Sequence, residues 1–252
     1  MKVILTGMTG TLAPYVNDAL KKKGYEVIVW NRSDVSTENQ EEINQFIQKA
    51  QPDYFFHLAT GPEAWIQKII NALKPYSIPF LFTSTEAVFD ESQKGPFTTK
   101  TEPGSMSDYG KYKRSCENTI NENYAENAYI VRIGWQIGLE PVKNNMLTYL
   151  VNNSPIYASD QWIPSTSFMP DTANALIKIV ESFQPGLYHV DGNEENWNFY
   201  QIVVSLKEVF SLPITIYKDS SFTRNNRLIN DPILIQSIQE TIRQLMKQKN
   251  QG

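Results

Sequence analysis

Tyr109 and Lys113 are the side chains whose types and spacing most directly suggest chemistry. They stand four residues apart where the sequence predicts a helix, and on a helix that spacing places both side chains on one face. An isolated tyrosine titrates near pH ~10. Because a neighbouring ammonium group stabilises the phenolate, we expect Lys113 to draw the phenol toward the range in which it can exchange a proton with a substrate. The same spacing also occurs on exposed amphipathic helices that do no chemistry.

A hydroxyl group upstream gives this pair a partner. Thr85 follows an apolar run that begins at Pro79 and predicts a strand ending in Thr83-Ser84-Thr85. A hydroxyl at that point can hydrogen-bond a substrate carbonyl beside the tyrosine. The connection from Thr85 to Asp108 is long and polar, and a long loop in a compact domain is often functional.

A glycine-rich turn follows the first predicted strand, in the segment Thr6-Gly7-Met8-Thr9-Gly10-Thr11-Leu12-Ala13. Gly7 permits a tight turn, Gly10 lets the backbone approach a pyrophosphate, and the small Ala13 lets the following helix pack on the sheet. The helix N-terminus would present free N–H groups and a partial positive charge to the phosphates. The turn could also connect a strand to a helix without any ligand, but its place after the first strand favours a dinucleotide site built from Gly7, Thr9, Gly10, Thr11 and Leu12.

The end of the second predicted strand bears on which dinucleotide would bind. In NAD-binding proteins an acidic residue here holds the ribose hydroxyls, whereas this chain has Asn31-Arg32. Arg32 could pair with a 2′-phosphate through its fork of donors, which favours NADP(H). Asp34 lies close enough in sequence to leave NAD(H) possible, and a solvated surface arginine is the alternative reading of Arg32.

Strand-like and helix-like segments alternate through the first half of the chain, which predicts βαβ units in an α/β fold of Rossmann type, with a doubly wound parallel sheet. We expect strands at Lys2–Thr6, Glu26–Asn31, Asp53–Leu58, Pro79–Ser84 and Ala128–Ile133. We expect helices at Thr11–Lys23, Thr37–Lys49, Glu63–Tyr76 and Tyr109–Asn123.

Beyond Ile133 the alternation loosens, because glycines and prolines break the chain into short pieces. We expect a small C-terminal substrate-binding lobe here, with two helices at Phe199–Phe210 and Pro232–Lys249 and a strand at Gly186–Val190. The whole chain, 1–252, is expected to form a single domain that binds NAD(P), with lobe segments mainly within 134–185 and 191–232.

Composition excludes several other classes. A net charge of −4 gives no electrostatic case for binding a nucleic acid polymer or an anionic membrane. Cys116 is the single cysteine and cannot form an internal disulfide, which suits a cytoplasmic protein. No cluster has metal-ligand spacing, so no catalytic metal is expected. The two histidines, His57 and His189, are expected to be hydrogen-bonded groups at strand ends.

Several segments resemble the dTDP-4-dehydrorhamnose reductases, which are extended short-chain dehydrogenases/reductases. Ser84-Thr85-Glu86-Ala87-Val88-Phe89-Asp90 resembles the family's Ser-Thr-Asp-Tyr-Val-Phe-Asp, and the segment from Tyr109 to Lys113 resembles its Tyr-Gly-Lys-x-Lys. Further similar segments are Val131-Arg132-Ile133-Gly134-Trp135, Asp160-Gln161 and Gly186-Leu187-Tyr188-His189-Val190.

The resemblance implies that Thr85, Tyr109 and Lys113 are catalytic. A hydride would pass from a nicotinamide to the C4 ketone of a nucleotide-linked sugar while Tyr109 supplies the proton, as in polysaccharide biosynthesis. A homodimer is possible. The implied cofactor contacts add Leu58, Ala59, Thr60, Thr83, Tyr109 and Lys113 to those above, and the implied substrate contacts are Thr85, Val88 and Trp135.

The sequence departs from the family's pattern in two places and leaves alternatives open. The segment Ile163–Ala173 differs from the family's substrate loop, and His57 replaces a usual asparagine. Dehydratases of the superfamily follow Ser-Thr with Asp-Glu, whereas this chain has Glu86-Ala87, and alanine cannot act as a base. A nucleotide-sugar epimerase remains open, although its usual acid after the second strand is absent. The second alternative is a non-catalytic NADP(H)-binding regulatory subunit. The β subunit of methionine adenosyltransferase is such a protein and resembles the same reductases.

Overall fold

The computed structural model describes residues 1–232 and 234–251, which form two compact units. The first unit comprises Met1–Asp90, Glu102–Arg132 and Ala173–Tyr188; the second comprises Glu91–Thr101, Ile133–Thr172 and His189–Gly252. The expectation of one domain with lobe segments within 134–185 and 191–232 stays a prediction, because compactness alone does not define a folding unit. Among the described residues, no helix combines the length and apolar character needed to span a bilayer.

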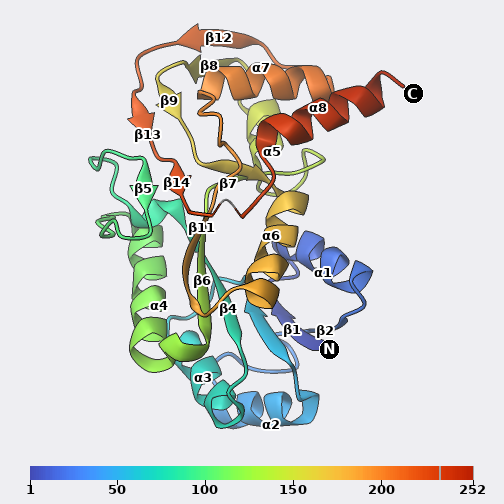
Figure 1. Cartoon of the computed structure of the whole chain (residues 1–252), viewed down its shortest axis with the longest axis vertical. Helices are drawn as coiled ribbons and strands as arrows, with labels where there is room; N and C mark the ends of the chain where they lie inside the picture. Colours follow the sequence, from blue (N-terminus) through green and yellow to red (C-terminus); the bar gives the residue numbers. More distant parts are fainter. Residues whose placement is uncertain (233, 252) are drawn as a thin grey trace. The chain divides into compact units, whose positions relative to one another are not determined.

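The first unit is built on a six-stranded sheet in the order β11-β6-β4-β3-β1-β2 (Figure 1). The strands are β1 (Lys2–Thr6), β2 (Glu26–Val29), β3 (Tyr54–His57), β4 (Phe80–Thr85), β6 (Ala128–Ile133) and β11 (Gly186–Val190). β1 is parallel to both β2 and β3, and β3 is parallel to β4. The chain therefore leaves β1 toward β2 and returns to its other side as β3, and in doubly wound sheets ligands bind beyond the carboxyl ends of the strands at such a switch point. This confirms the Rossmann-type fold.

Helices cover both faces of the sheet, as a buried parallel sheet requires. They are α1 (Ala13–Lys22), α2 (Gln40–Ala50), α3 (Ala64–Leu73), α4 (Asp108–Tyr124) and α6 (Met169–Ser182), with the 3₁₀ helices η1 (Lys74–Tyr76), η2 (Glu86–Val88) and η3 (Ala125–Asn127). α3 packs against both α2 and α4, whereas α1 and α6 lie on the other side of the sheet (Figure 1).

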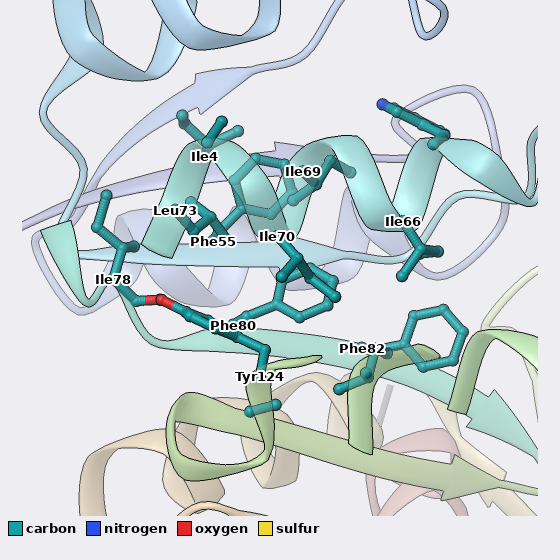
Figure 2. Packing of buried hydrophobic residues seen from close by; sticks show 14 of the residues in the cluster. Ile4, Phe55, Ile66, Ile69, Ile70, Leu73, Ile78, Phe80, Phe82 and Tyr124 are labelled. Atoms are coloured by element: carbon teal, nitrogen blue, oxygen red, sulfur yellow. The ribbon is translucent and has the colours of Figure 1, made fainter. Parts of the chain in front are cut away.

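The core between the sheet and α3 consists of aromatic and branched side chains. Phe55 on β3 and Phe80 on β4 are fully buried and pack with Ile70 of α3 (Figure 2). Tyr124, near the end of α4, donates its hydroxyl hydrogen to the Ile78 carbonyl at 2.8 Å, so its polar atom is satisfied inside this apolar layer. The core fixes α3 and α4 against the strands whose ends bear the candidate site.

The second unit contains short strand pairs instead of a large sheet. The parallel pairs are β5 (Phe97–Thr98) with β14 (Leu228–Ile229), β7 (Trp135–Ile137) with β10 (Thr166–Phe168), β8 (Ile156–Ser159) with β12 (Ile216–Asp219), and β9 (Trp162–Ile163) with β13 (Arg224–Asn225). Its helices are α5 (Met146–Asn152), α7 (Phe199–Phe210) and α8 (Ile238–Lys249). Leu147, Ile202 and Ile238, one from each helix, are fully buried in a shared core.

Several predicted boundaries are wrong by a few residues, and capping explains two of them. The helix expected at Pro232–Lys249 begins only at Ile238, because the Ser237 hydroxyl accepts a hydrogen bond from the Glu240 N–H. The helix expected from Thr37 begins at Gln40, because Asn39 caps it. The helix expected to reach Tyr76 ends at Leu73 and continues as η1, which contains a proline. α6 was not predicted.

Candidate functional site

The glycine turn packs tightly against the loop that follows β3. Gly7 adopts a positive φ of 89°, and a Cβ there would lie 3.0 Å from the Leu58 carbonyl carbon and 3.1 Å from the Ala59 nitrogen. The Gly10 N–H donates to the Gly7 carbonyl at 2.8 Å, which closes the turn. Only glycine fits at position 7 without strain and displacement, so the backbones of the two loops lie against each other.

Thr6 ties the ends of β1 and β3 together. Its Oγ1 accepts hydrogen bonds from the Leu58 N–H at 3.1 Å and from the Ala59 N–H at 3.2 Å, and it lies 3.2 Å from His57 Nδ1. Because two N–H groups occupy the oxygen lone pairs, the hydroxyl hydrogen must be donated to Nδ1. Sequence reasoning missed Thr6, although a hydroxyl residue directly before the first glycine was a visible signal.

His57 is therefore a neutral ring with its hydrogen on Nε2. The ring is completely buried, and burial lowers its pKa well below the ordinary value of histidine. The positive charges of Lys113 and Arg32 lower the pKa further. Its Nδ1 is hydrogen-bonded, as expected for a strand-end histidine. Within the described residues its buried Nε2 makes no hydrogen bond, and the ring stands edge-on to Trp65 at a centroid distance of 4.7 Å.

The N-terminus of α1 is open to an anion. No side chain caps it, which is also true of α3, whereas the side chains of Asn39, Ser107, Asn145, Asn198 and Ser237 cap α2, α4, α5, α7 and α8. Thr9 and Gly10 in the preceding turn are exposed. Pro14 has no N–H, and the Tyr15 N–H already donates to the Leu12 carbonyl at 3.0 Å, so of the first turn the Ala13 N–H is the donor that can reach a phosphate. A phosphate site at this end of α1 stays a prediction.

Arg32 is exposed but held in place. Its guanidinium donates to the Thr60 carbonyl oxygen and lies over the Trp65 ring, 4.9 Å from the ring centroid. This places Arg32 beside the loop Leu58–Thr60, which the resemblance assigns to the cofactor. The Asn31 side chain instead forms a local turn, accepting from the Ser33 N–H at 3.2 Å and donating to Asp34 at 3.0 Å.

The position of α4 depends on Gly110. The Ser107 hydroxyl caps the helix by accepting from the Gly110 N–H at 3.1 Å. A Cβ on Gly110 would overlap the Ala87 carbonyl oxygen in η2 and the Ser105 Oγ. Glycine therefore lets the first turn of α4, which contains Tyr109, pack directly against the turn that follows Thr85.

Lys113 is almost completely buried and points to the end of β4. Its Nζ donates to the Thr83 carbonyl oxygen at 2.8 Å and lies 4.5 Å from the Phe82 ring centroid and 6.0 Å from that of Tyr109. Burial lowers the pKa of Lys113 to about 8, and Cys116 and Glu117 oppose that shift. The ammonium is thus close to the tyrosine, as the spacing predicts.

Tyr109 and Thr85 lie on either side of the contact between α4 and η2. Tyr109 is about half exposed, and in the cofactor-free protein its pKa is raised by partial burial and by the Glu86 carboxylate. The lowering expected from Lys113 and an oxidised nicotinamide together stays a prediction. The Thr85 Oγ1 accepts from the Ala87 N–H at 3.1 Å, which leaves its own hydrogen free to donate.

Val88 and Trp135 have different surroundings. Val88 is fully buried, and its carbonyl accepts from the N–H groups of Gly104 and Ser105. Trp135 belongs to the second unit, where its ring lies 5.1 Å from that of Tyr149 and stacks on Trp162 at 6.3 Å. A substrate contact for either residue stays a prediction. Within the described part of the chain, no group of three or more histidine, cysteine, aspartate or glutamate side chains could hold a metal ion.

Comparison with known proteins shows which family the chain belongs to. The family model described as the RmlD substrate binding domain matches residues 1–223. Over 233 residues the chain is 25% identical to the spore coat polysaccharide biosynthesis protein SpsK of Bacillus subtilis (strain 168), with 85% of this chain and 81% of that protein covered.

Two solved structures show the same fold. A dTDP-4-dehydrorhamnose reductase from Clostridium acetobutylicum superposes with a TM-score of 0.82 at 20% identity, covering 99% of this chain and 100% of that one. The enzyme from Bacillus anthracis in complex with NADP has a TM-score of 0.82 at 17% identity, covering 98% and 99%. Together with the family model, which spans most of the sequence, they show that this chain belongs to the RmlD substrate binding domain family, a family of the extended short-chain dehydrogenase/reductase fold.

Proposed function

We propose that this protein is an NADP(H)-dependent reductase of a nucleotide-linked 4-keto-sugar, similar to dTDP-4-dehydrorhamnose reductase. The observation that supports it most is the buried Lys113 ammonium, which is bonded to the Thr83 carbonyl and lies beside the Tyr109 ring. Burying an ammonium group costs free energy, which its hydrogen bond to the Thr83 carbonyl offsets only in part. The similarity to a spore coat polysaccharide biosynthesis protein agrees with a role in building a polysaccharide precursor.

The residues of the first unit fit a dinucleotide phosphate. The uncapped start of α1 and the exposed turn before it offer N–H donors to a pyrophosphate, and Arg32 offers a fixed guanidinium to a 2′-phosphate. An NADP complex is known for the similar Bacillus anthracis enzyme. The residues proposed to hold the cofactor are Gly7, Thr9, Gly10, Thr11, Leu12, Asn31, Arg32, Leu58, Ala59, Thr60, Thr83, Tyr109 and Lys113.

The proposed chemistry reduces a ketone to an alcohol. Bound NADPH would supply a hydride to the carbonyl carbon. Tyr109 donates its phenolic proton to the carbonyl oxygen, and its raised pKa keeps the phenol protonated at neutral pH before the reaction. The Thr85 hydroxyl, whose hydrogen is free, donates to the same oxygen and orients it. The Lys113 ammonium stabilises the phenolate that remains, and the half-exposed Tyr109 regains its proton from solvent.

The two alternatives have weaker support. An epimerase would hold NAD through an acid after β2, whereas Asn31 is engaged in a local turn and Arg32 lies over Trp65. A regulatory NADP(H)-binding subunit needs no acid and base. A regulatory role therefore does not account for the buried Lys113 beside Tyr109. Either alternative predicts cofactor binding without net oxidation of the cofactor by a keto-sugar.

The test is turnover. NADPH and NADH oxidation is followed by nicotinamide absorbance with dTDP-4-keto-6-deoxy-hexose as substrate, and the sugar product is identified. Net NADPH oxidation with formation of the 4-hydroxy sugar is the expected result. Cofactor binding without turnover on this and on other nucleotide-linked 4-keto-sugars would reject the reductase in favour of one of the two alternatives.

Turnover is expected to fall as the pH rises through about 8, the pKa of Lys113 in the cofactor-free protein. The sign follows from the charge: above that pH the lysine becomes neutral and no longer stabilises the phenolate. The measurement is kcat/KM against pH, which reports groups of the free enzyme. A profile that stays flat from pH 7 to pH ~10 would show that the charge of Lys113 is not needed.

Replacing Arg32 with Asp is expected to weaken NADPH binding far more than NADH binding, because a carboxylate would repel a 2′-phosphate that NADH lacks. Dissociation constants of both cofactors, measured by fluorescence titration, check this. Lys100→Asp, which makes the same charge change at an exposed residue of the second unit, is the control. Equal losses of affinity for the two cofactors would show that Arg32 does not bind the 2′-phosphate.

A further inference from the structure

The first unit buries an ion pair that the proposed chemistry does not use. Arg132 donates to Glu117 through Nε at 2.9 Å and through Nη2 at 2.7 Å, and the two side chains are only 3% and 4% exposed. Burying two charges costs desolvation energy that a well-packed apolar pair would avoid. Stability alone is therefore a poor reason for the pair.

Glu117, the acidic member of the pair, lies one helical turn after Lys113 along α4. Tyr109, Lys113 and Glu117 follow one another at intervals of four residues on α4, so they share a face. Lys113 binds the Thr83 carbonyl on β4, and Glu117 binds Arg132 on β6, the neighbouring strand. Two polar contacts about 6 Å apart along the helix hold α4 on two strands, and sliding or rotating the helix would break both.

Arg132 also contacts the segment that follows Thr85. Its guanidinium lies 5.1 Å from the Phe89 ring centroid, and the Phe89 N–H donates to the Glu86 carbonyl at 3.0 Å to close η2. Thr85 caps η2 through the Ala87 N–H. Arg132 thus touches both the helix that bears Tyr109 and the turn that Thr85 begins.

We propose that the Glu117–Arg132 ion pair is a positioning pair, which holds Tyr109 and Lys113 of α4 in register with Thr85 at the end of β4. The proposal rests on the proposed reductase function. The titratable groups facing Lys113 are Tyr109, Tyr112, Cys116 and Glu117 on its own helix and His57 on β3. Cys116 and then Glu117 oppose the effect of burial on the Lys113 pKa, so losing the Glu117 carboxylate has an effect on that pKa that packing alone would not produce.

The decisive variant is Glu117→Gln, which preserves the shape of the side chain and one acceptor for Arg132 but removes the charge. Lys113 is expected to titrate at a lower pH than in the wild type, and kcat is expected to fall about ten- to hundredfold, with KM for the sugar changed far less, because a small misplacement of reacting groups costs rate more than binding. The titration is followed on the cofactor-free full chain by NMR of ¹³Cε-labelled lysine, with the Lys113 signal identified by its loss in Lys113→Met.

The matched control is Asp191→Asn, which breaks the buried Asp191–Arg227 pair of the second unit, where Nε and Oδ2 lie 2.8 Å apart. It is expected to lower the stability to urea without moving the Lys113 titration. If Glu117→Gln does not fold, the pair Glu117→Leu with Arg132→Met leaves no uncompensated charge and is expected to show the same loss of kcat. Its shift of the Lys113 titration is expected to be smaller, because the positive charge of Arg132 is removed together with the carboxylate.

An unchanged Lys113 titration together with unchanged kcat, in whichever of these variants folds, would overturn the positioning role and leave the ion pair as a structural contact. Absence of turnover in the wild type would reject the proposed function instead. The NMR titration does not depend on turnover, so the two failures are distinguishable.

Discussion

Replacing Tyr109 with Phe is expected to reduce the turnover of a nucleotide-linked 4-keto-sugar by about 10²- to 10⁴-fold, the usual contribution of a positioned general acid. The variant loses the only atom that differs between the two side chains, the phenolic oxygen. Because Tyr109 is about half exposed and lies at the start of α4, the change should cost the fold little. Binding of NADP⁺ should stay close to that of the wild type.

The measurements for Tyr109→Phe are steady-state NADPH oxidation and NADP⁺ titration on the same preparation. Tyr76→Phe, at an exposed tyrosine of η1, is the matched control and should behave as the wild type. Turnover retained within about twofold of the wild type would remove Tyr109 from the mechanism, since a general acid contributes far more than that.

Replacing Gly110 with Ala is expected to reduce both stability and turnover. The added methyl group would overlap the Ala87 carbonyl and Ser105, so α4 must move away from η2. Overpacking of this kind costs about 1–3 kcal/mol of unfolding free energy. A shift of about 1 Å between Tyr109 and Thr85 would reduce kcat about a hundredfold.

Urea unfolding and kcat measured together check the Gly110→Ala prediction. Lys111→Ala, one residue further along the same helix at an exposed position, should change neither by much. If Gly110→Ala folds as stably as the wild type and turns over at the same rate, then the close approach of α4 to η2 is not what positions the site.

The sheet strands could be read from the sequence because each contains a short apolar stretch near turn residues. β1, β6 and β11 have the predicted bounds, and so does α7. The second unit was harder to predict because its strands are only two to four residues long and their pairing joins segments about 30 to 130 residues apart in the sequence. Such strands leave no periodic pattern in the sequence.

The candidate site was predicted in part. Motifs identified Thr85, Tyr109 and Lys113, and the structure brings Lys113 beside the Tyr109 ring at the contact between α4 and η2. They did not identify Glu117 and Arg132, because a bidentate ion pair depends on which face of α4 meets which strand. The raising of the Tyr109 pKa in the cofactor-free protein could not be predicted either, since burial and Glu86 act through the fold and not through the helical spacing.

The hydrogen bond from Thr6 to His57 bears on how far this chain departs from its family at that position. The ring receives the hydroxyl hydrogen at Nδ1, and its low pKa keeps that nitrogen unprotonated. The side-chain oxygen of asparagine, the residue usual in the resembled reductases, is an acceptor too. Histidine and asparagine can therefore play the same part for Thr6, and the exchange of one for the other is compatible with an unchanged junction between the glycine turn and the loop after β3.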